Sequence, residues 1–321
     1  MTTIVSTFGS ELAEATAASY NRTFADIPFC WPIDAQALMD PATLPCDNLS
    51  ALRGDLLLVA REGQAVVGYV HVVVEDAKPE GERDWDDYAQ TQGVLRMFWY
   101  ERGYRAAGAV LLEQAESHVR AHGLQRIEVM HSKRGYPWYH LPHVHLTQRL
   151  EHVHALLYAH GFARDKSNVA LIWPDAANAP LAPCALDYHL RIEREDCSGP
   201  AKRRLLFAEQ GDTFCGMCVG ASLAEQHADL RARDWSYIRW LTVDEPFRRQ
   251  GLAQRLLTET FRTMAGEGAR HAAICCIEEN TPALLLYANM GFRAVDFTYT
   301  YVKALHQQSA QVNEPASPLC P

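Results

Sequence analysis

The chain has 321 residues, of which 48% are hydrophobic and 21% charged, and its formal net charge is -9. This ordinary globular composition excludes wholesale disorder, and no run approaches the roughly 18 consecutive apolar residues of a membrane span. The N-terminus lacks a basic start followed by an apolar core, so we expect a cytoplasmic protein. Because the charge balance is acidic, we expect neither a nucleic acid nor a membrane as a partner.

A chain of this length predicts two domains, at about 150 residues per domain. A linker rich in Ala and Pro is predicted near residues 173–183, which separates domains at 1–174 and 184–305. Residues 306–321 contain three prolines and show little periodicity, so they are predicted to form a disordered tail.

The predicted elements follow one order in both halves. Two apolar runs around a Gly-containing turn predict a β-hairpin at residues 55–75, and an aromatic run at 94–100 predicts a strand that leads through a loop into a helix. The corresponding helix of the second half carries apolar residues on one face, at Leu252, Leu256, Leu257, Phe261 and Met264. A strand, a short helix and a last strand follow it, at 271–279, 280–292 and 293–305. This alternation predicts layered α/β (α+β) domains.

The two halves share residues at matching positions. Three groups of matches occur in the same order: Arg96, Tyr104, Arg105 and Gly108 with Arg239, Phe247, Arg248 and Gly251; Gly63 and Gly68 with Gly211 and Gly216; Gly161 and Phe162 with Gly291 and Phe292. Because each group falls in the same kind of predicted element, the order of the matches indicates a duplicated domain.

The loop at residues 244–251 joins a predicted strand to a predicted helix. A helix N-terminus presents unpaired N–H groups and the positive end of a dipole, and a glycine there allows close approach of a ligand. Arg248 and Arg249 add positive charge beside it. The pattern predicts a phosphate or pyrophosphate site. A solvated basic loop that caps the helix is the alternative.

At this loop the second half resembles the GNAT family of acyl-CoA-dependent N-acetyltransferases. The family pattern of a strand, Gln/Arg-x-x-Gly-x-Gly/Ala and a helix stands here as RRQGLA at residues 248–253. About 40 residues later the family has an Asn that opens a helix, an Ala, a Tyr and Gly-Phe, which stand here as Asn280, Ala283, Tyr287, Gly291 and Phe292. The resemblance covers nearly all of residues 186–305, and the internal repeat extends it to the first half. It implies two GNAT-like domains, each a mixed twisted sheet flanked by helices, with two central strands that splay apart.

The resemblance also implies where acetyl-CoA would bind in the second half. The pantetheine would lie beside Leu241, Thr242 and Val243, with an oxyanion held by backbone N–H groups there. The pyrophosphate would be held by the loop and helix start, at Arg248, Arg249, Gln250, Gly251, Leu252 and Ala253. Asn280 belongs to the same motif, and Tyr287 would be the general acid that donates a proton to the leaving thiolate.

Each half departs from the family pattern in one region. The first-half loop is RAAGAV, with Val110 where the family has Gly or Ala, and Leu157 stands at the position of Tyr287 with Tyr158 beside it. We expect this half to bind CoA poorly or to serve as a scaffold. The second half has only about ten residues between its first two strands, where the family has helices that roof the acceptor site. The first half is therefore expected to supply the missing wall, through its insertion around residues 136–145.

A general base is needed because an amine with a pKa of about 10.4 is neutral in only about one part in 10³ at pH 7. Glu278, at the end of the strand beside the cleft, is the candidate, and Glu279 is its neighbour. A solvated strand end is the alternative for both.

No metal site is predicted, although seven histidines fall between residues 131 and 160 and Cys215 and Cys218 form a CxxC. His140, His143 and His145 have metal-compatible side chains, but the spacing of histidines is unspecific without a matching fold. We interpret the segment as a polar, aromatic-rich loop that flanks the cleft or the domain interface.

The resemblance therefore implies an enzyme that moves an acetyl group from acetyl-CoA to a primary amine of a small molecule or peptide. A non-catalytic CoA-binding or interaction module is the alternative. The acceptor and the oligomeric state remain open from the sequence.

Overall fold

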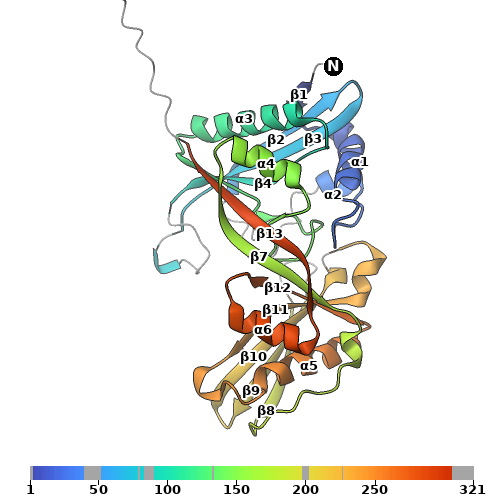
Figure 1. The fold of residues 1–321 in the computed structure, drawn as a ribbon, viewed down its shortest axis with the longest axis vertical. Coiled ribbons are helices and arrows are strands. Elements are labelled where there is room, and N and C mark those ends of the chain that lie inside the picture. Colours follow the sequence, from blue (N-terminus) through green and yellow to red (C-terminus); the bar gives the residue numbers. More distant parts are fainter. Residues whose placement is uncertain are drawn as a thin grey trace, which may run out of the picture.

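The computed structural model describes residues 3–39, 52–78, 80–82, 90–131, 134–196, 202–225 and 227–305. The predicted tail at 306–321 lies outside them. The molecule is elongated, with the first half at one end and the second half at the other (Figure 1). None of the described helices is long and apolar enough to cross a membrane.

The first half contains the elements that the sequence predicts and a long helical connection after its first strand. Its strands are β1 (Ile4–Thr7), β2 (Leu52–Glu62), β3 (Ala65–Glu75), β4 (Gln92–Tyr100), β5 (Arg126–Val129), β6 (Leu146–Thr147) and β7 (Ala163–Trp173). Its α-helices are α1 (Ala13–Thr23), α2 (Ala35–Met39), α3 (Arg105–Ala121) and α4 (Glu151–Ala159). Short 3₁₀ turns are η1 (Ser10–Leu12), η2 (Glu80–Glu82) and, in the linker, η4 (Ala176–Asn178).

The second half repeats this order without counterparts of α1 and α2. Its strands are β8 (His189–Asp196), β9 (Lys202–Gln210), β10 (Thr213–Ser222), β11 (Trp235–Val243), β12 (His271–Ile277) and β13 (Arg293–Ala304). Its α-helices are α5 (Leu252–Ala265) and α6 (Thr281–Met290), and its 3₁₀ turns are η5 (Leu223–Glu225), η6 (Leu230–Asp234) and η7 (Glu245–Phe247). β8 ends at Asp196 and β9 begins at Lys202, so five residues separate them, whereas the first half has α1 and α2 between β1 and β2.

The described strands form one mixed sheet in which the halves exchange their last strands. The order is β1-β2-β3-β4-β5-β13-β7-β12-β11-β10-β9-β8, and β6 pairs with β13 off this path. The last strand of the second half, β13, therefore lies between β5 and β7 of the first half, with Tyr301 opposite Val129. In the same way β7 of the first half borders β12 of the second, with Leu171 opposite Ile274. Figure 1 shows β7 and β13 running side by side between the two lobes.

Two shared backbone features support the internal repeat. Gly63 and Gly211 turn the corresponding hairpins with φ of 60° and 59°, a region that favours glycine. The pairing register of each central strand also shifts at an arginine, at Arg96 in β4 and Arg239 in β11, so each is the extra residue of a β-bulge. The matched arginines of the sequence therefore occupy the same structural position.

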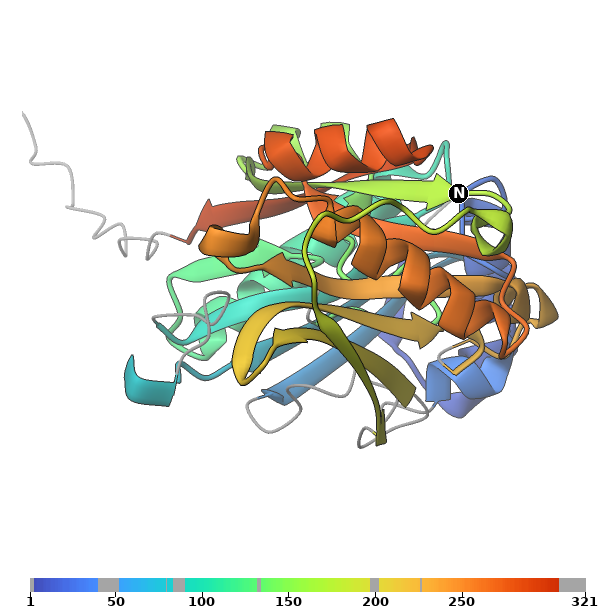
Figure 2. The ribbon, with the colours of Figure 1, turned by 90° about the horizontal axis from the view of Figure 1, so that it is seen from below.

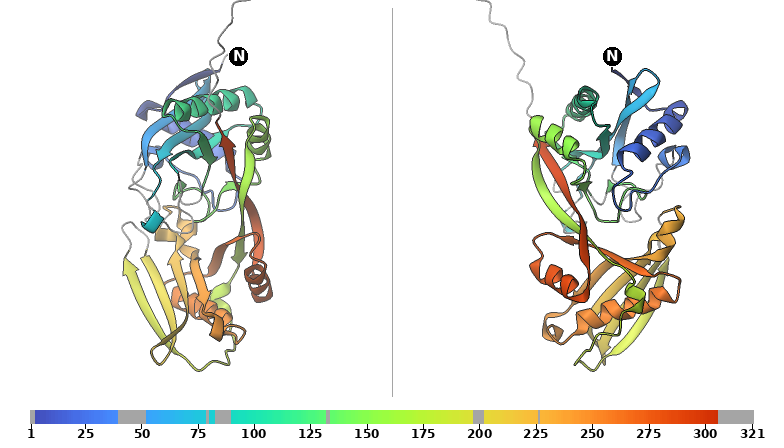
Figure 3. Two further views of the ribbon diagram at one scale, coloured as in Figure 1. Left: turned by 90° about the vertical axis from the view of Figure 1, so that its left-hand side faces the viewer. Right: turned by 45° about the vertical axis from the view of Figure 1, so that its right-hand side comes forward.

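Helices cover both faces of the first-half sheet but one face of the second. On β3, a Cβ at Gly68 would meet Leu111 of α3. The next residue, Tyr69, stacks on Trp99, and Trp99 contacts Tyr20 of α1. Successive residues of a strand point to opposite faces, so α3 and α1 cover opposite sides. In the second half α5 lies across the strands on one side (Figures 2 and 3). On the other side Trp240 is 49% exposed, although its first-half counterpart Met97 is fully buried.

Candidate functional site

Two neighbouring strands part in the middle of the second half. β11 and β12 pair in parallel as far as Ile238 and Ile274, and no register partner on β12 follows for the rest of β11. The bulge at Arg239 comes directly after the last pair. A bulge bends its strand and increases the local twist, so it accounts for the opening. The sequence-predicted residues Leu241, Thr242 and Val243 lie along the parted edge, partly buried, and pair with β10 on their other side.

The loop after β11 ends in a helix N-terminus with two left-handed residues. Arg249 has φ of 64° and Gly251, the N-cap of α5, has φ of 87°. Within the described chain, no hydrogen-bond acceptor contacts the backbone N–H groups of residues 249–254. Successive free N–H groups next to a left-handed residue form a concave anion site, and the helix dipole adds to it. This segment therefore fits a phosphate group.

The side chains of the loop divide between structural and exposed roles. The Arg248 Nε–H donates to the carbonyl of Val243 at 2.8 Å, and the Gln250 side-chain amide donates to the carbonyl of Pro246 at 3.3 Å. Both contacts hold the loop against the end of β11. Arg249 is exposed at the surface beside the free N–H groups. Leu252 is buried in the core under α5, and Ala253 is partly buried.

Gly251 is also required by a contact within the protein. A Cβ at this position would lie 2.4 Å from the carbonyl oxygen of Pro183 in the linker, and the N–H of Ala185 donates to the carbonyl of Gln250 at 3.0 Å. From the sequence, we expected glycine here because it allows close approach of a ligand. The structure supplies a different reason for glycine, because the linker packs directly on this residue.

Tyr287 on α6 points into the core beneath the opening. Its side chain is 6% exposed and packs against Phe292 with ring centroids 5.6 Å apart. Burial raises the pKa of the Tyr287 phenol above its ordinary value, and the nearby Cys276 and Cys218 thiols raise it further. Cys218 lies on β10 and Cys276 on β12, the two strands on either side of β11, so the tyrosine lies close to β11 and to the opening beside it. A phenol that keeps its proton at neutral pH is suited to donate one.

The structure places Glu278 and Asn280 at the rim. Glu278 is exposed, and its backbone N–H donates to the carbonyl of Ser167 on β7 at 3.1 Å. The Glu279 carboxylate accepts from the Ser167 hydroxyl at 3.1 Å. Asn280 is the N-cap of α6, and its side-chain oxygen accepts from the N–H of Ala283 at 3.3 Å. The asparagine therefore fixes the start of the helix that carries Tyr287.

The equivalent opening of the first half is closed. β4 and β5 also stop pairing just before the bulge, after Leu95 and Val129. The ring of Tyr100 then lies against α3, where a Cβ at Gly108 would be 2.4 Å from it. The Tyr100 hydroxyl donates to the carbonyl of His152 at 2.6 Å, and the His152 Nε2–H donates back to the carbonyl of Tyr100 at 2.8 Å. These bonds fasten the end of β4 to α4.

The first-half helix also begins earlier along the chain. α3 starts at Arg105, so Gly108 is helical and is not the N-cap, unlike Gly251. Val110, which stands where the family has Gly or Ala, is 36% exposed in the second turn of α3, whereas the ring of Tyr100 lies against the helix at Gly108. Tyr158 is 49% exposed and packs on Tyr301, with 5.3 Å between ring centroids. It therefore points away from the position that Tyr287 occupies in the second half.

The histidine-rich segment connects the halves. His140 lies 3.1 Å from the Asp296 carboxylate on β13, and both side chains are fully buried. His154 contacts the Tyr301 hydroxyl at 2.7 Å. Among the described residues, no group of three or more His, Cys, Asp or Glu side chains is arranged to hold a metal ion.

Comparisons with known proteins agree with this geometry. Residues 170–292 match the family described as "Acetyltransferase (GNAT) family". An 86-residue stretch is 31% identical to the N-alpha-acetyltransferase MAK3 of Arabidopsis thaliana, and it covers 27% of this chain and 45% of that protein. The match therefore spans less than half the length of this curated relative.

Solved structures share the fold over nearly the whole chain. A tandem GNAT protein from the clavulanic acid biosynthesis pathway matches with a TM-score of 0.69 at 14% identity, over 95% of this chain and 99% of that one. A GCN5-related N-acetyltransferase from Sphaerobacter thermophilus matches with a TM-score of 0.62 at 14% identity, over 95% and 96% of the two chains. At such identities the likeness concerns the fold. The chain therefore has the fold of the tandem GNAT structures, with two GNAT-like domains, and residues 170–292 match the model of the acetyltransferase family.

Proposed function

We propose that the protein is an N-acetyltransferase that moves an acetyl group from acetyl-CoA to a primary amine, and that acetyl-CoA binds in the second half alone. The observation that carries the proposal is the parting of β11 and β12 beside the free N–H groups of residues 249–254. A thioester arm fits between two parted strands, and its pyrophosphate fits a helix N-terminus.

The residues of the second half have complementary tasks in this proposal. The N–H groups of residues 249–254 bind the pyrophosphate, and Arg249 adds charge. Leu241, Thr242 and Val243 border the pantetheine. Tyr287 holds a proton near the sulfur and donates it as the thiolate leaves. The rest of the acceleration comes from holding the amine and the thioester together in one cleft.

The first half contributes the acceptor side. Only five residues separate β8 from β9 in the second half, and Pro142 and His143 of the first half contact Tyr237 and Cys275. The two halves together therefore enclose the place where an amine would approach. Closure of the first-half opening by Tyr100 supports a single acetyl-CoA site per chain.

The test combines a binding measurement with an activity screen. Titration calorimetry with acetyl-CoA is expected to give one site per chain, and a panel of primary amines is expected to release free CoA thiol only when a suitable amine is present. Two equivalent sites would contradict the assignment to the second half. Binding of acetyl-CoA without release by any small or peptide amine would favour the non-catalytic alternative.

A further inference from the structure

Two exposed apolar side chains flank the place where β11 and β12 part. Trp240 is 49% exposed and Ile277 is 47% exposed. Trp240 is the second residue of β11 after its last pair with β12, and Ile277 is the third residue of β12 after that pair. Covering such side chains with a ligand removes their apolar surface from water, which is favourable. Their place beside a candidate active site therefore indicates a ligand with an apolar part.

Both side chains lie on the face of the sheet that is turned away from α5. Neighbouring residues of a strand point to opposite faces. Leu241 packs against the core under α5, so Trp240, which precedes it, points the other way. Cys276 belongs to the same core, so Ile277, which follows it, also points away from α5. The two side chains therefore stand on one face, on either side of the opening.

A loop of the first half borders this face where the strands begin to part. The Tyr237 hydroxyl donates to the carbonyl of Pro142 at 2.6 Å, and the Cys275 thiol donates to the carbonyl of His143 at 3.1 Å. Tyr237 and Cys275 both pack with the core of the first half. Cys275 comes two residues before Ile277 on β12, which is about 7 Å along a strand. The exposed apolar pair therefore begins close to the first-half loop.

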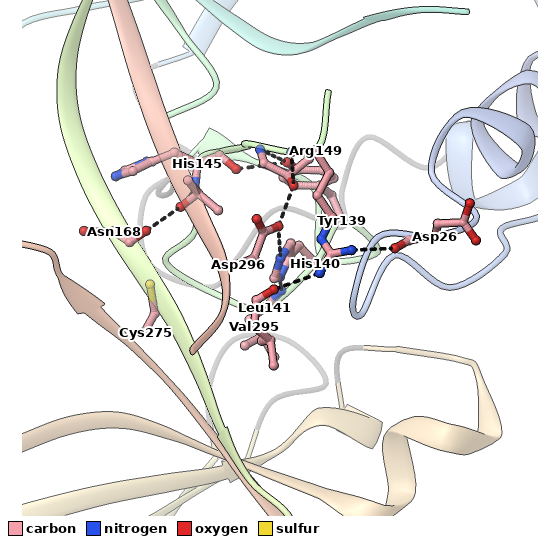
Figure 4. A network of polar contacts seen from close by, with 12 residues as sticks. Asp26, Tyr139, His140, Leu141, His145, Arg149, Asn168, Cys275, Val295 and Asp296 are labelled. Carbon is pink, nitrogen blue, oxygen red and sulfur yellow. Dashed lines mark hydrogen bonds and ion pairs between the residues drawn. The ribbon is translucent and has the colours of Figure 1, made fainter. Parts of the chain in front are cut away.

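Buried contacts with the exchanged strand hold this loop. The His140 imidazole lies 3.1 Å from the Asp296 carboxylate (Figure 4). The N–H of His145 donates to the Thr298 hydroxyl at 3.0 Å. Asp296 and Thr298 both belong to β13. The part of the border that the first half supplies is therefore fixed by a strand of the second half.

The corresponding face of the first half is covered. Met97, the counterpart of Trp240, is fully buried in a core that includes Tyr20 of α1. The described elements of the second half include no counterpart of α1, which leaves Trp240 at the surface. A surface that the first half uses for packing is thus open to a ligand in the second half.

Acidic residues follow both parted strands. Glu278 comes directly after Ile277 and is exposed, and Asp244 and Glu245, which follow β11, are exposed as well. An amine with a pKa of about 10.4 arrives mostly as an ammonium ion, which carboxylates attract. Arg249 lies beside the N–H groups that would bind the pyrophosphate, so its charge would be neutralised there. The surroundings of the apolar pair therefore favour a cationic acceptor.

We propose that the acceptor is a primary amine joined by a short linker to an apolar, preferably aromatic, group, and that Trp240 and Ile277 bind this group. The inference rests on the proposed function and names its substrate class. Trp240 precedes Leu241, which borders the pantetheine, so a group that packs on the indole holds its amine near the thioester. An arylalkylamine and a peptide with an apolar first residue share this chemistry. Trp240 determines specificity and takes no part in proton transfer.

The test compares acceptors that differ in their apolar group. Wild-type protein is expected to acetylate 2-phenylethylamine with a kcat/KM at least about tenfold above that of ethylamine. Two tripeptides, Phe-Gly-Gly and Ser-Gly-Gly, form the second arm. A preference for the Phe peptide over 2-phenylethylamine would identify the source as a peptide N-terminus, and the reverse preference would identify it as a small molecule; either supports the substrate class.

Trp240→Ala and Trp240→Phe separate recognition from structure. In W240A the kcat/KM for 2-phenylethylamine is expected to fall at least about tenfold, mainly through KM, while that for ethylamine changes less than about twofold. W240F keeps an aromatic ring and should recover most of the loss. Ile277→Ala should lower the same kcat/KM by about threefold or more. Acetyl-CoA affinity, measured by calorimetry, should stay within about twofold of wild type in all three variants.

Ile192→Ala is the matched control. Ile192 is 51% exposed on β8, but it pairs with Leu206 of the core under α5, so it lies on the other face of the sheet. I192A should match wild type with every acceptor. A loss in I192A equal to that in W240A would show that removing any exposed apolar residue has this effect, and would contradict the specific role of Trp240.

Three further results would overturn the inference. A wild-type preference for ethylamine and the Ser peptide would exclude the substrate class while the proposed function stands. Equal losses of W240A with 2-phenylethylamine and ethylamine would make Trp240 structural. A parallel loss of acetyl-CoA affinity would place Trp240 in the acetyl-CoA site. If the wild-type protein releases no CoA with any amine, the proposed function fails first and the substrate class fails with it.

Discussion

At the scale of single residues, Tyr287 has the sharpest expected phenotype. Tyr287→Phe keeps the ring that packs on Phe292 but removes the hydroxyl. If the phenol donates to the leaving sulfur, turnover should fall by about 10²-fold while acetyl-CoA affinity changes little. Steady-state kinetics with the screened amine and calorimetry with acetyl-CoA measure the two effects. Full activity in this variant would reduce Tyr287 to a packing residue.

Buried histidines predict a loss of stability in mild acid. Burial lowers the pKa of His71, His152, His154 and His227, and for His227 it falls from 6.5 to about 4. The unfolded chain takes up these protons first as the pH falls, so the free energy of unfolding decreases below about pH 6.5. The contribution of His227 is lost progressively between pH 6.5 and about 4.

His227→Phe tests this linkage. The ring of His227 lies edge-on to Trp31, with centroids 4.7 Å apart, and phenylalanine preserves that packing without titrating. The free energy of unfolding, measured by urea denaturation at several pH values, should depend less steeply on pH between 6.5 and 4 in the variant. Parallel pH profiles of the two proteins would show that His227 does not titrate as its burial requires.

At the scale of elements, the start of α5 depends on Gly251. Gly251→Ala places a Cβ against the Pro183 carbonyl at a positive φ, whereas Gly268→Ala introduces the same strain at φ of 101° with open space around it. We expect G268A to cost about 1 kcal/mol of unfolding free energy. G251A should cost more than about 2 kcal/mol and weaken acetyl-CoA binding at least about tenfold. Thermal denaturation and calorimetry compare them, and equal effects would argue against the linker contact.

The sequence allowed the elements of the second half to be predicted because each has a local signal. The apolar face of α5, the glycine after α6 and the alternation in β13 are all local patterns. Strand pairing is not local, so nothing in β13 indicated that it would border β5 and β7. The bulges at Arg96 and Arg239 were visible as a repeat, but their effect on strand pairing was not.

The candidate site was predictable to the same extent. The loop at residues 248–253 and Tyr287 follow a sequence pattern, and the structure brings both to the same opening. Closure of the opening between β4 and β5 was not predictable, because it depends on where α3 begins and on where the ring of Tyr100 lies. In the sequence, Tyr100 is only one aromatic residue of a predicted strand.

At the scale of the whole molecule, the strand exchange predicts that the halves unfold together. Residues 184–305 alone would leave β13 without β5 and β7, and β12 without β7. We expect this fragment to show no cooperative unfolding transition by circular dichroism. The full chain should unfold in one transition, and acetyl-CoA should move that whole transition to a higher temperature. A folded fragment that binds acetyl-CoA, or two transitions of which one responds to ligand, would contradict this.

The same exchange constrains how the protein is made. A ribosome synthesises β5 well before β13, so the nascent first half waits for a strand that follows all the other elements of the second half. Until then β5 and β7 each present an unpaired edge, and such edges invite association with other chains. Domains usually fold in the order in which they are synthesised, but here the first half is completed only after the last strand of the second half has been made.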